Sequence, residues 1–219
     1  MIEGVTRRVP KELAVTAARL ALLAIGAIFA GRILLTGPIG HVVARDIDTP
    51  IRNFVTRPRD PAWHDALAHV SALGTAGVTG AVAAVAAVVC SLRTRRPTAA
   101  LQLAAAFGGA ALLTIVVKFG VNRQPASGPI GRFAAGTFPS GHTLFAVSVY
   151  GTIVLMVVRS GARRGLSRAL AALVAVLVIA IGASRVYLLD HYLSDVVASL
   201  VLGAAWVAIV GSSATTRAT

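Results

Sequence analysis

Six apolar segments, each long enough to cross a lipid bilayer, limit the possible folds of this chain more than any other feature. A membrane-spanning helix needs about 20 mostly apolar residues, because its backbone polar groups must all be satisfied within the segment. Only 13% of the residues are charged and the mean hydropathy is +0.79, whereas a soluble domain carries about 25% charged residues. The approximate spans are 13–36, 66–92, 98–118, 142–158, 168–184 and 192–211. The sequence therefore predicts an all-α integral membrane bundle of six transmembrane helices, formed by one domain over residues 1–219.

The distribution of basic residues predicts the orientation of this bundle. A net charge of +13 and a pI near 11.7 would suggest nucleic acid as the partner of a soluble protein. Here, however, Lys and Arg cluster between the apolar segments, as they do in the cytoplasmic loops of membrane proteins. With a cytoplasmic N-terminus, the inner side holds eleven basic residues and the outer side nine, of which Lys118, Arg123 and Arg185 have a chemical reason to be there. We therefore predict that both termini are cytoplasmic, and we expect no nucleic-acid partner.

The long connection over residues 37–65 has two readings. Ile47, Ile51, Phe54 and Val55 recur at helical spacing between polar residues. This spacing is typical of a short amphipathic helix that lies at the membrane interface. An ordinary solvated loop is the alternative.

The connection between the fifth and sixth segments carries the strongest functional pattern. Residues 184–195 fit S-R-x5-H-x3-D at every fixed position. The pattern places Arg185, His191 and Asp195 where the fifth membrane segment ends and the sixth begins. Placing ionisable side chains at the membrane costs free energy, so a functional site is the default interpretation. On a helix, the four-residue spacing lets the Asp195 carboxylate hydrogen-bond one ring nitrogen of His191 and aim the other outward. The alternative is a structural Arg–Asp pair beside an interfacial histidine.

Lys118 and Arg123 close the third segment and form a second candidate group. Both cations can turn toward one anion as the helix ends. Taken alone, the pair is more typical of basic side chains that reach for lipid headgroups. The connection that follows, residues 119–141, is rich in Gly and Pro, which predicts an irregular segment able to wrap around a ligand.

A third group, Pro139-Ser140-Gly141-His142, opens the fourth segment. Ser140 is expected near the N-cap of the helix, where the first backbone N–H groups form an anion site. Gly141 would let the backbone come close to a ligand, and His142 adds a proton donor. Without its neighbours, this histidine would be an ordinary interfacial residue.

The predicted topology brings the three groups to one membrane surface. The first two share a connection, and two further crossings return the chain to the same face for the third. Three cations, two histidines, a serine and an aspartate suit a phosphate monoester or diphosphate. Arginine fits this ligand well because its planar fork matches phosphate oxygens in bidentate fashion.

Together these groups resemble the three signature motifs of the type-2 phosphatidic-acid phosphatase superfamily, a family of membrane lipid phosphatases. Its motifs run K-x6-R-P, P-S-G-H and S-R-x5-H-x3-D, and the second and third match completely here. The resemblance covers roughly residues 60–210, with the motifs within residues 118–195.

The first motif departs from the family pattern. Counted from Lys118, its Arg falls at Pro125 and its Pro at Ala126. Arg123 either matches an extra Arg that many members carry two places earlier or replaces the usual one through a local shift. Arg132, further along the same connection, is another candidate substitute.

The resemblance implies hydrolysis through a phosphohistidine. His191 would attack phosphorus, Asp195 would orient His191, and His142 would protonate the leaving oxygen. The residues expected to hold the phosphate oxygens are Lys118, Arg123, Ser140, Gly141 and Arg185. No carboxylate cluster for Mg²⁺ accompanies these residues in the sequence, so we expect no metal and no cofactor.

The expected function is therefore removal of a phosphate from a membrane lipid of the phosphatidic acid, phosphatidylglycerol phosphate or polyprenyl (di)phosphate type. No sequence feature selects among these lipids or predicts an oligomeric state. The rival hypotheses are a non-hydrolytic transporter or flippase and an inactive binding relative for lipid-linked phosphates. Transporters usually place ionisable groups near mid-span, whereas here they lie at span ends. Small size and an Ala-, Arg- and Val-rich composition suggest a bacterial plasma (inner) membrane protein with its active site on the extracytoplasmic face.

Overall fold

The computed structural model describes residues 2–56, 61–95, 97–124 and 136–215, with side chains described between residues 14 and 213. All secondary-structure elements of the described residues are helices, and none is a strand. The elements are α1 (Ile2–Leu35), α2 (Gly37–Val43), the π-helix η1 (Ala44–Asp48), α3 (Thr49–Val55), α4 (Pro61–Ala72), α5 (Ala76–Thr94), α6 (Thr98–Val121), α7 (Gly141–Arg159), α8 (Arg164–Tyr187) and α9 (Leu193–Thr215). The predicted all-α membrane bundle is confirmed: among the described helices, six are long and apolar enough to cross a bilayer, namely α1, α5, α6, α7, α8 and α9.

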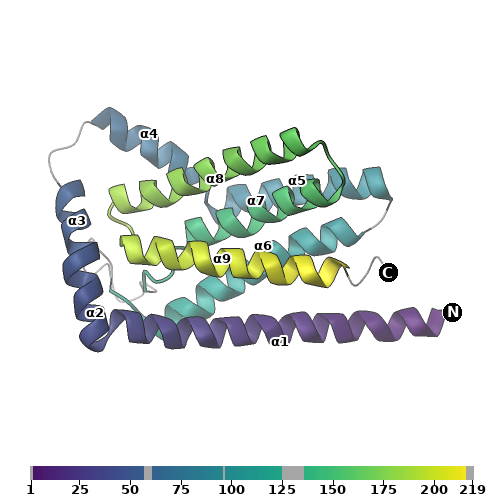
Figure 1. Cartoon of the computed structure of the whole chain (residues 1–219), viewed down its shortest axis with the longest axis horizontal. Helices are drawn as coiled ribbons and strands as arrows, with labels where there is room; N and C mark the ends of the chain where they lie inside the picture. The colour runs from purple at the N-terminus through teal and green to yellow at the C-terminus, as the bar shows by residue number, and fades with distance from the viewer. Residues whose placement is uncertain (1, 57–60, 96, 125–135, 216–219) are drawn as a thin grey trace.

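The six spans run alongside one another, with both chain termini at one end of the bundle (Figure 1). At the opposite end, α2 and α3 run across the direction of the spans. Helices α6 and α8 finish at this opposite end, and α7 and α9 start there. The motif-bearing ends of four helices therefore meet at one surface of the bundle.

Helix α7 lies at the centre and positions the P-S-G-H motif at its start. It packs against α5, α6, α8 and α9. One apolar cluster joins α7 to α1, α6 and α9 around Leu113 and Trp206, and a second joins it to α5, α6 and α8 around Val149 and Ile181. Because α7 is enclosed by neighbours, its N-terminus has little freedom to shift relative to the ends of α6, α8 and α9.

Trp206 fixes α9 against α6. Its side chain is only 2% exposed, and its Nε1–H donates to the carbonyls of Ala105 and Ala106, both at 3.2 Å. The ring lies so close to Gly109 that a Cβ atom there would be 2.1 Å from Cζ2 of the indole. Small residues of this kind let helix backbones approach closely in lipid.

The predicted second span, 66–92, is wrong at its start. The chain forms two helices there, α4 and α5, separated by a turn. Thr75 adopts an extended backbone conformation, and its hydroxyl accepts the N–H of Val78, so it caps a new helix. At the same turn, a Cβ atom on Gly74 would lie 2.9 Å from the carbonyl oxygen of His142. The break thus allows the turn to pass close over the start of α7.

In the connection between the first two spans, residues 37–55 are helical, where the sequence left helix and loop open. Ile47 lies in η1, and Ile51, Phe54 and Val55 lie in α3. Both α2 and α3 carry a proline in the first turn, a position where the missing N–H of proline has no intrahelical partner to lose. The consecutive helices α2, η1 and α3 therefore place η1 at the motif-bearing end of the bundle.

We expect Gly109→Ala to destabilise the protein by about 1–3 kcal/mol, the usual cost of overpacking a filled interior, because the new methyl group collides with Trp206. The matched control is Gly108→Ala in the same helix, where a Cβ atom meets nothing within 4 Å. The thermal unfolding midpoint of the detergent-solubilised protein should fall for the first variant and stay near that of the wild type for the second. Equal midpoints for the two variants would contradict the packing described for α6 and α9.

Candidate active site

The three sequence motifs lie together at the end of the bundle opposite the termini (Figure 1). Lys118 lies in the last turn of α6 and Arg185 in the last turn of α8, while Asp195 lies in the first turn of α9. His142 is the second residue of α7, and His191 lies just before α9. His142 is within electrostatic range of Lys118, Arg185 and His191, so these groups form one site.

The imidazole of His191 lies beside the Asp195 carboxylate. His191 is 7% exposed and Asp195 is 0% exposed. Nδ1 of the ring lies 3.5 Å from Oδ2 of Asp195, a long separation for a hydrogen bond. Nδ1 has no hydrogen-bond partner within the described part of the chain, so the hydrogen bond expected from the sequence is not formed, although the carboxylate lies beside the ring. The same Oδ2 accepts the backbone N–H of Tyr192 at 3.1 Å.

The other oxygen of Asp195 is bound by Arg123. NH1 of the guanidinium donates to Oδ1 at 2.5 Å and to Oγ of Ser194 at 2.7 Å. The guanidinium also stacks on the ring of Tyr192, with its central carbon 4.0 Å from the ring centroid. Arg123, which follows the end of α6, thus contacts Tyr192, Ser194 and Asp195, which lie next to His191 in the chain.

Asp48 is a site residue that sequence reasoning missed. It is the last residue of η1 and only 2% exposed. Its Oδ2 accepts from NH2 of Arg123 at 2.6 Å and from the Ser194 hydroxyl at 2.7 Å, while Oδ1 accepts the backbone N–H of Ser194 at 3.1 Å. The sequence offers only an acidic residue in an amphipathic pattern, with no motif to mark this long-range contact.

The contacts of Arg123 are not those expected for a phosphate-binding residue. Both terminal nitrogens of its guanidinium face carboxylates, so its assignment to the phosphate stays a prediction. Arg132, the other candidate for the missing Arg of the first motif, lies outside the described residues.

Lys118 and Arg185 are partly buried cations with different surroundings. The ammonium group of Lys118 donates to the carbonyl of Gly136 at 3.0 Å. Arg185 donates to the Ser71 hydroxyl at 2.7 Å and pairs with Asp190 at 2.9 Å. Nε of Arg185 is buried and has no hydrogen-bond partner within the described part of the chain.

Ser140 is the N-cap of α7, as predicted from the sequence, with an extended backbone. Its hydroxyl accepts from Oγ1 of Thr143 at 3.1 Å, and its backbone N–H donates to the carbonyl of Asp195 at 3.4 Å. A Cβ atom on Gly141 would lie 3.2 Å from Cγ2 of Thr114. The small residue at 141 therefore lets the start of α7 pack against α6, next to the helix end where anions are favoured.

Burial and charge set the protonation of the two site groups outside the spans. Burial lowers the pKa of the His191 imidazole below its ordinary value of 6.5, although the neighbouring Asp195 carboxylate opposes this shift. His191 is therefore neutral at pH 7 and has a free lone pair. Burial alone would lower the pKa of Arg123, but Asp195 and Asp48 together hold it above its ordinary value.

The arrangement can bind an anion and present a neutral nucleophile to it. Within residues 14–56, 61–95, 97–124 and 136–213, no group of three or more His, Cys, Asp or Glu side chains is placed to hold a metal ion. Among the described side chains, Lys118 and Arg185 place positive charge near His191. Acyl-transfer and phosphoryl-transfer enzymes stabilise developing charge with donors of this kind.

Fold and site together define a multi-pass membrane protein with a buried His–Asp pair among cationic side chains. The PAP2 superfamily model matches residues 21–218. The chain therefore belongs to the PAP2 superfamily, which confirms the resemblance and supports a lipid phosphatase in general terms.

Among solved structures, the chain is similar to the first transmembrane PAP2-type phosphatidylglycerolphosphate phosphatase from Bacillus subtilis. The two are 20% identical in sequence and superpose with a TM-score of 0.73, over 89% of this chain and 94% of the other. At this level of identity the similarity shows the fold. No curated protein matches this chain in sequence.

Proposed function

We propose that the protein hydrolyses a phosphate monoester or diphosphate of a membrane lipid through a covalent phosphohistidine, without a metal ion. The observation that carries the proposal is the buried His191–Asp195 pair, which lies within electrostatic range of Lys118 and Arg185. Membership in the PAP2 superfamily supports the same chemistry.

In the first step, Nε2 of His191 attacks phosphorus, and the bond between phosphorus and the lipid oxygen breaks. The imidazolium form of His142 donates a proton to that oxygen, so the lipid leaves as an alcohol or as a shorter phosphate and His142 becomes neutral. The positive charge that develops on the His191 ring is stabilised by the Asp195 carboxylate beside Nδ1. Water then attacks phosphorus, His142 accepts a proton from it, and inorganic phosphate leaves with His191 restored.

The phosphate oxygens are held by Lys118, Arg185 and the N-terminal turn of α7 with Ser140 and Gly141. These donors are fixed before the substrate arrives, which makes charge stabilisation in the transition state effective. The sequence motif assigns Arg123 to the same group. Its contacts with two carboxylates favour a different role.

The substrate class is a lipid phosphate with an exposed headgroup. The structural neighbour is a phosphatidylglycerolphosphate phosphatase, which makes phosphatidylglycerol phosphate a first substrate to test. Phosphatidic acid and polyprenyl (di)phosphates belong in the same panel. The site faces the extracytoplasmic side if both termini are cytoplasmic, because it lies at the end of the bundle away from them (Figure 1).

Purified protein should release phosphate from at least one lipid of this panel, and His191→Ala should abolish release while the protein remains folded. Release should persist in EDTA, because side chains supply the positive charge. The Asp65→Asn variant, which alters an exposed carboxylate on α4, is the matched control and should retain activity. Substrate binding without phosphate release by the wild type would instead identify a transporter or an inactive binding relative.

Thiol labelling tests the orientation. In a Cys90→Ala background, a cysteine at Asn53, exposed on α3, should react with a membrane-impermeant thiol reagent in intact cells. A cysteine at Ser160, exposed between α7 and α8, should react only after the cells are opened. The reverse pattern would place the site on the cytoplasmic side and leave the proposed chemistry unchanged.

A further inference from the structure

Arg123 joins two buried carboxylates that are far apart in sequence. NH2 of the guanidinium lies 2.6 Å from Oδ2 of Asp48, and NH1 lies 2.5 Å from Oδ1 of Asp195. The Arg123 side chain is 14% exposed, while those of Asp48 and Asp195 are 1% and 0% exposed. Buried charges of this kind persist only when each is paired and hydrogen-bonded.

Ser194 completes the connection between Asp48 and α9. Its hydroxyl donates to Asp48 and accepts from Arg123, and its backbone N–H donates to the other oxygen of Asp48. Both oxygens of Asp48 are therefore occupied by groups next to Asp195. Asp48 belongs to the π-helix η1, and π-helical turns are frequent at functional sites.

We propose that Asp48 and Arg123 are positioning residues for the His191–Asp195 pair, an inference that rests on the proposed function. Arg123 holds Oδ1 of Asp195, so that Oδ2 stays directed at His191. Asp48 in turn holds Arg123 at the start of α9 and prevents the guanidinium from turning to the phosphate. The two carboxylates and one guanidinium carry a net negative charge, which favours the positive charge that His191 gains on attack.

The proposal differs from the phosphate-binding role in what it predicts for kinetics. A residue that holds phosphate affects the affinity for inorganic phosphate or vanadate, whereas a positioning residue affects turnover. Asp48→Asn and Arg123→Lys should each lower kcat about 10–100-fold, by analogy with the loss on removing a residue that orients a metal-bound histidine. The inhibition constants of phosphate and vanadate should stay near those of the wild type.

Asp46→Asn is the matched control, because Asp46 lies in the same η1 and pairs with Arg45 on the exposed surface at 2.6 Å. It should leave kcat unchanged. Combining Asp48→Asn with Arg123→Lys should cost less than the product of the single losses, because both act through one unit. If Asp48→Asn does not fold, Arg123→Lys decides the question.

An unchanged kcat in a folded Asp48→Asn or Arg123→Lys variant would overturn the proposal, and so would weaker phosphate inhibition in Arg123→Lys. Absence of phosphate release by the wild type would contradict the proposed function itself, so the two failures are distinguishable.

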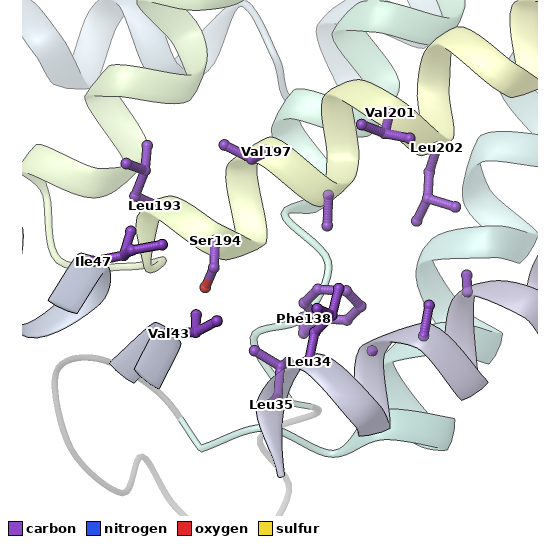
Figure 2. Close-up of a pocket in the computed structure, with 14 residues that line it drawn as sticks. Leu34, Leu35, Val43, Ile47, Phe138, Leu193, Ser194, Val197, Val201 and Leu202 are labelled. Carbon is purple, nitrogen blue, oxygen red and sulfur yellow. The ribbon is translucent and has the colours of Figure 1, made fainter. Parts of the chain in front are cut away.

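An apolar groove lies between α1 and α9, and Val43 of α2 and Ile47 of η1 also line it (Figure 2). Its volume is about 480 Å³, within the range of about 300–1,000 Å³ typical of ligand pockets. Leu34 and Leu35 of α1 line one side, and Val197 and Val201 of α9 line the other. Both walls belong to membrane spans, so the groove lies at lipid depth.

One end of this groove borders the site. Phe138 lines it and directly precedes the P-S-G-H motif, and Leu193 and Ser194 line it between His191 and Asp195. Leu193 also lines the small pocket beside His191. The groove therefore borders residues within or next to two of the three motifs.

We infer that the groove holds one hydrocarbon chain of the lipid phosphate while its phosphate lies at His191, an inference that also rests on the proposed function. The walls are apolar and cannot hold the headgroup. The chain must enter the membrane from a phosphate held at the bundle end, and this groove leads from that end along two spans. Shape complementarity to the chain would then help to orient the phosphorus for attack.

Ala30→Trp, which fills the groove from α1, should lower kcat/KM for a long-chain phosphatidic acid about tenfold or more, in line with losses on misfilling an apolar pocket. Hydrolysis of p-nitrophenyl phosphate, which has no chain, should be unchanged. Ala175→Trp is the matched control, since it fills another apolar groove, between α7 and α8. Equal losses for both substrates, or no loss for either, in Ala30→Trp would overturn the inference.

Discussion

The carboxylate of Asp195 is the interaction on which the site depends. It is fully buried and carries charge at the end of a membrane bundle, where an uncompensated carboxylate would cost several kcal/mol. Arg123 and the backbone N–H of Tyr192 supply the compensation. The main chain of the same residue accepts the N–H of Ser140, so one residue connects the ends of α6, α7 and α9.

The membrane explains why the site is built at helix ends. Within the spans, nearly every side chain is apolar or small, and the helices pack through features such as Gly109 against Trp206. Charged groups can be accommodated only where the spans end and partners come from neighbouring helices. The contacts of α7 with α5, α6, α8 and α9 fix the helix start that carries His142, and Gly74, in the turn between α4 and α5, packs closely against the same helix start.

Much of this arrangement follows from local sequence. Six apolar segments predicted the six spans, and the 191/195 spacing predicted that His191 and Asp195 lie close together, because both signals depend on residues close in the chain. The expected helical setting of this pair is wrong, since His191 precedes α9 and only Asp195 lies in the helix. The break between α4 and α5 was missed because apolar residues continue on both sides of it, although Gly74 and the N-cap residue Thr75 are local signals of a helix end and a helix start. Asp48 was missed for a related reason: its partners are Arg123 and Ser194, 75 and 146 positions away, and no periodicity reports a contact of that range. The contacts of Arg123 could not be foreseen without Asp48.

The central claim is that His191 becomes covalently phosphorylated, and the most direct measurement is to locate the phosphoryl group on the protein. Wild-type protein should be mixed with a ³²P-labelled lipid phosphate, quenched in alkali, where the N–P bond of phosphohistidine survives, and digested. The account predicts label on the peptide that contains His191, with no label in His191→Ala. Label on another residue, or phosphate release by the wild type with no labelled peptide under any quench time, would contradict it.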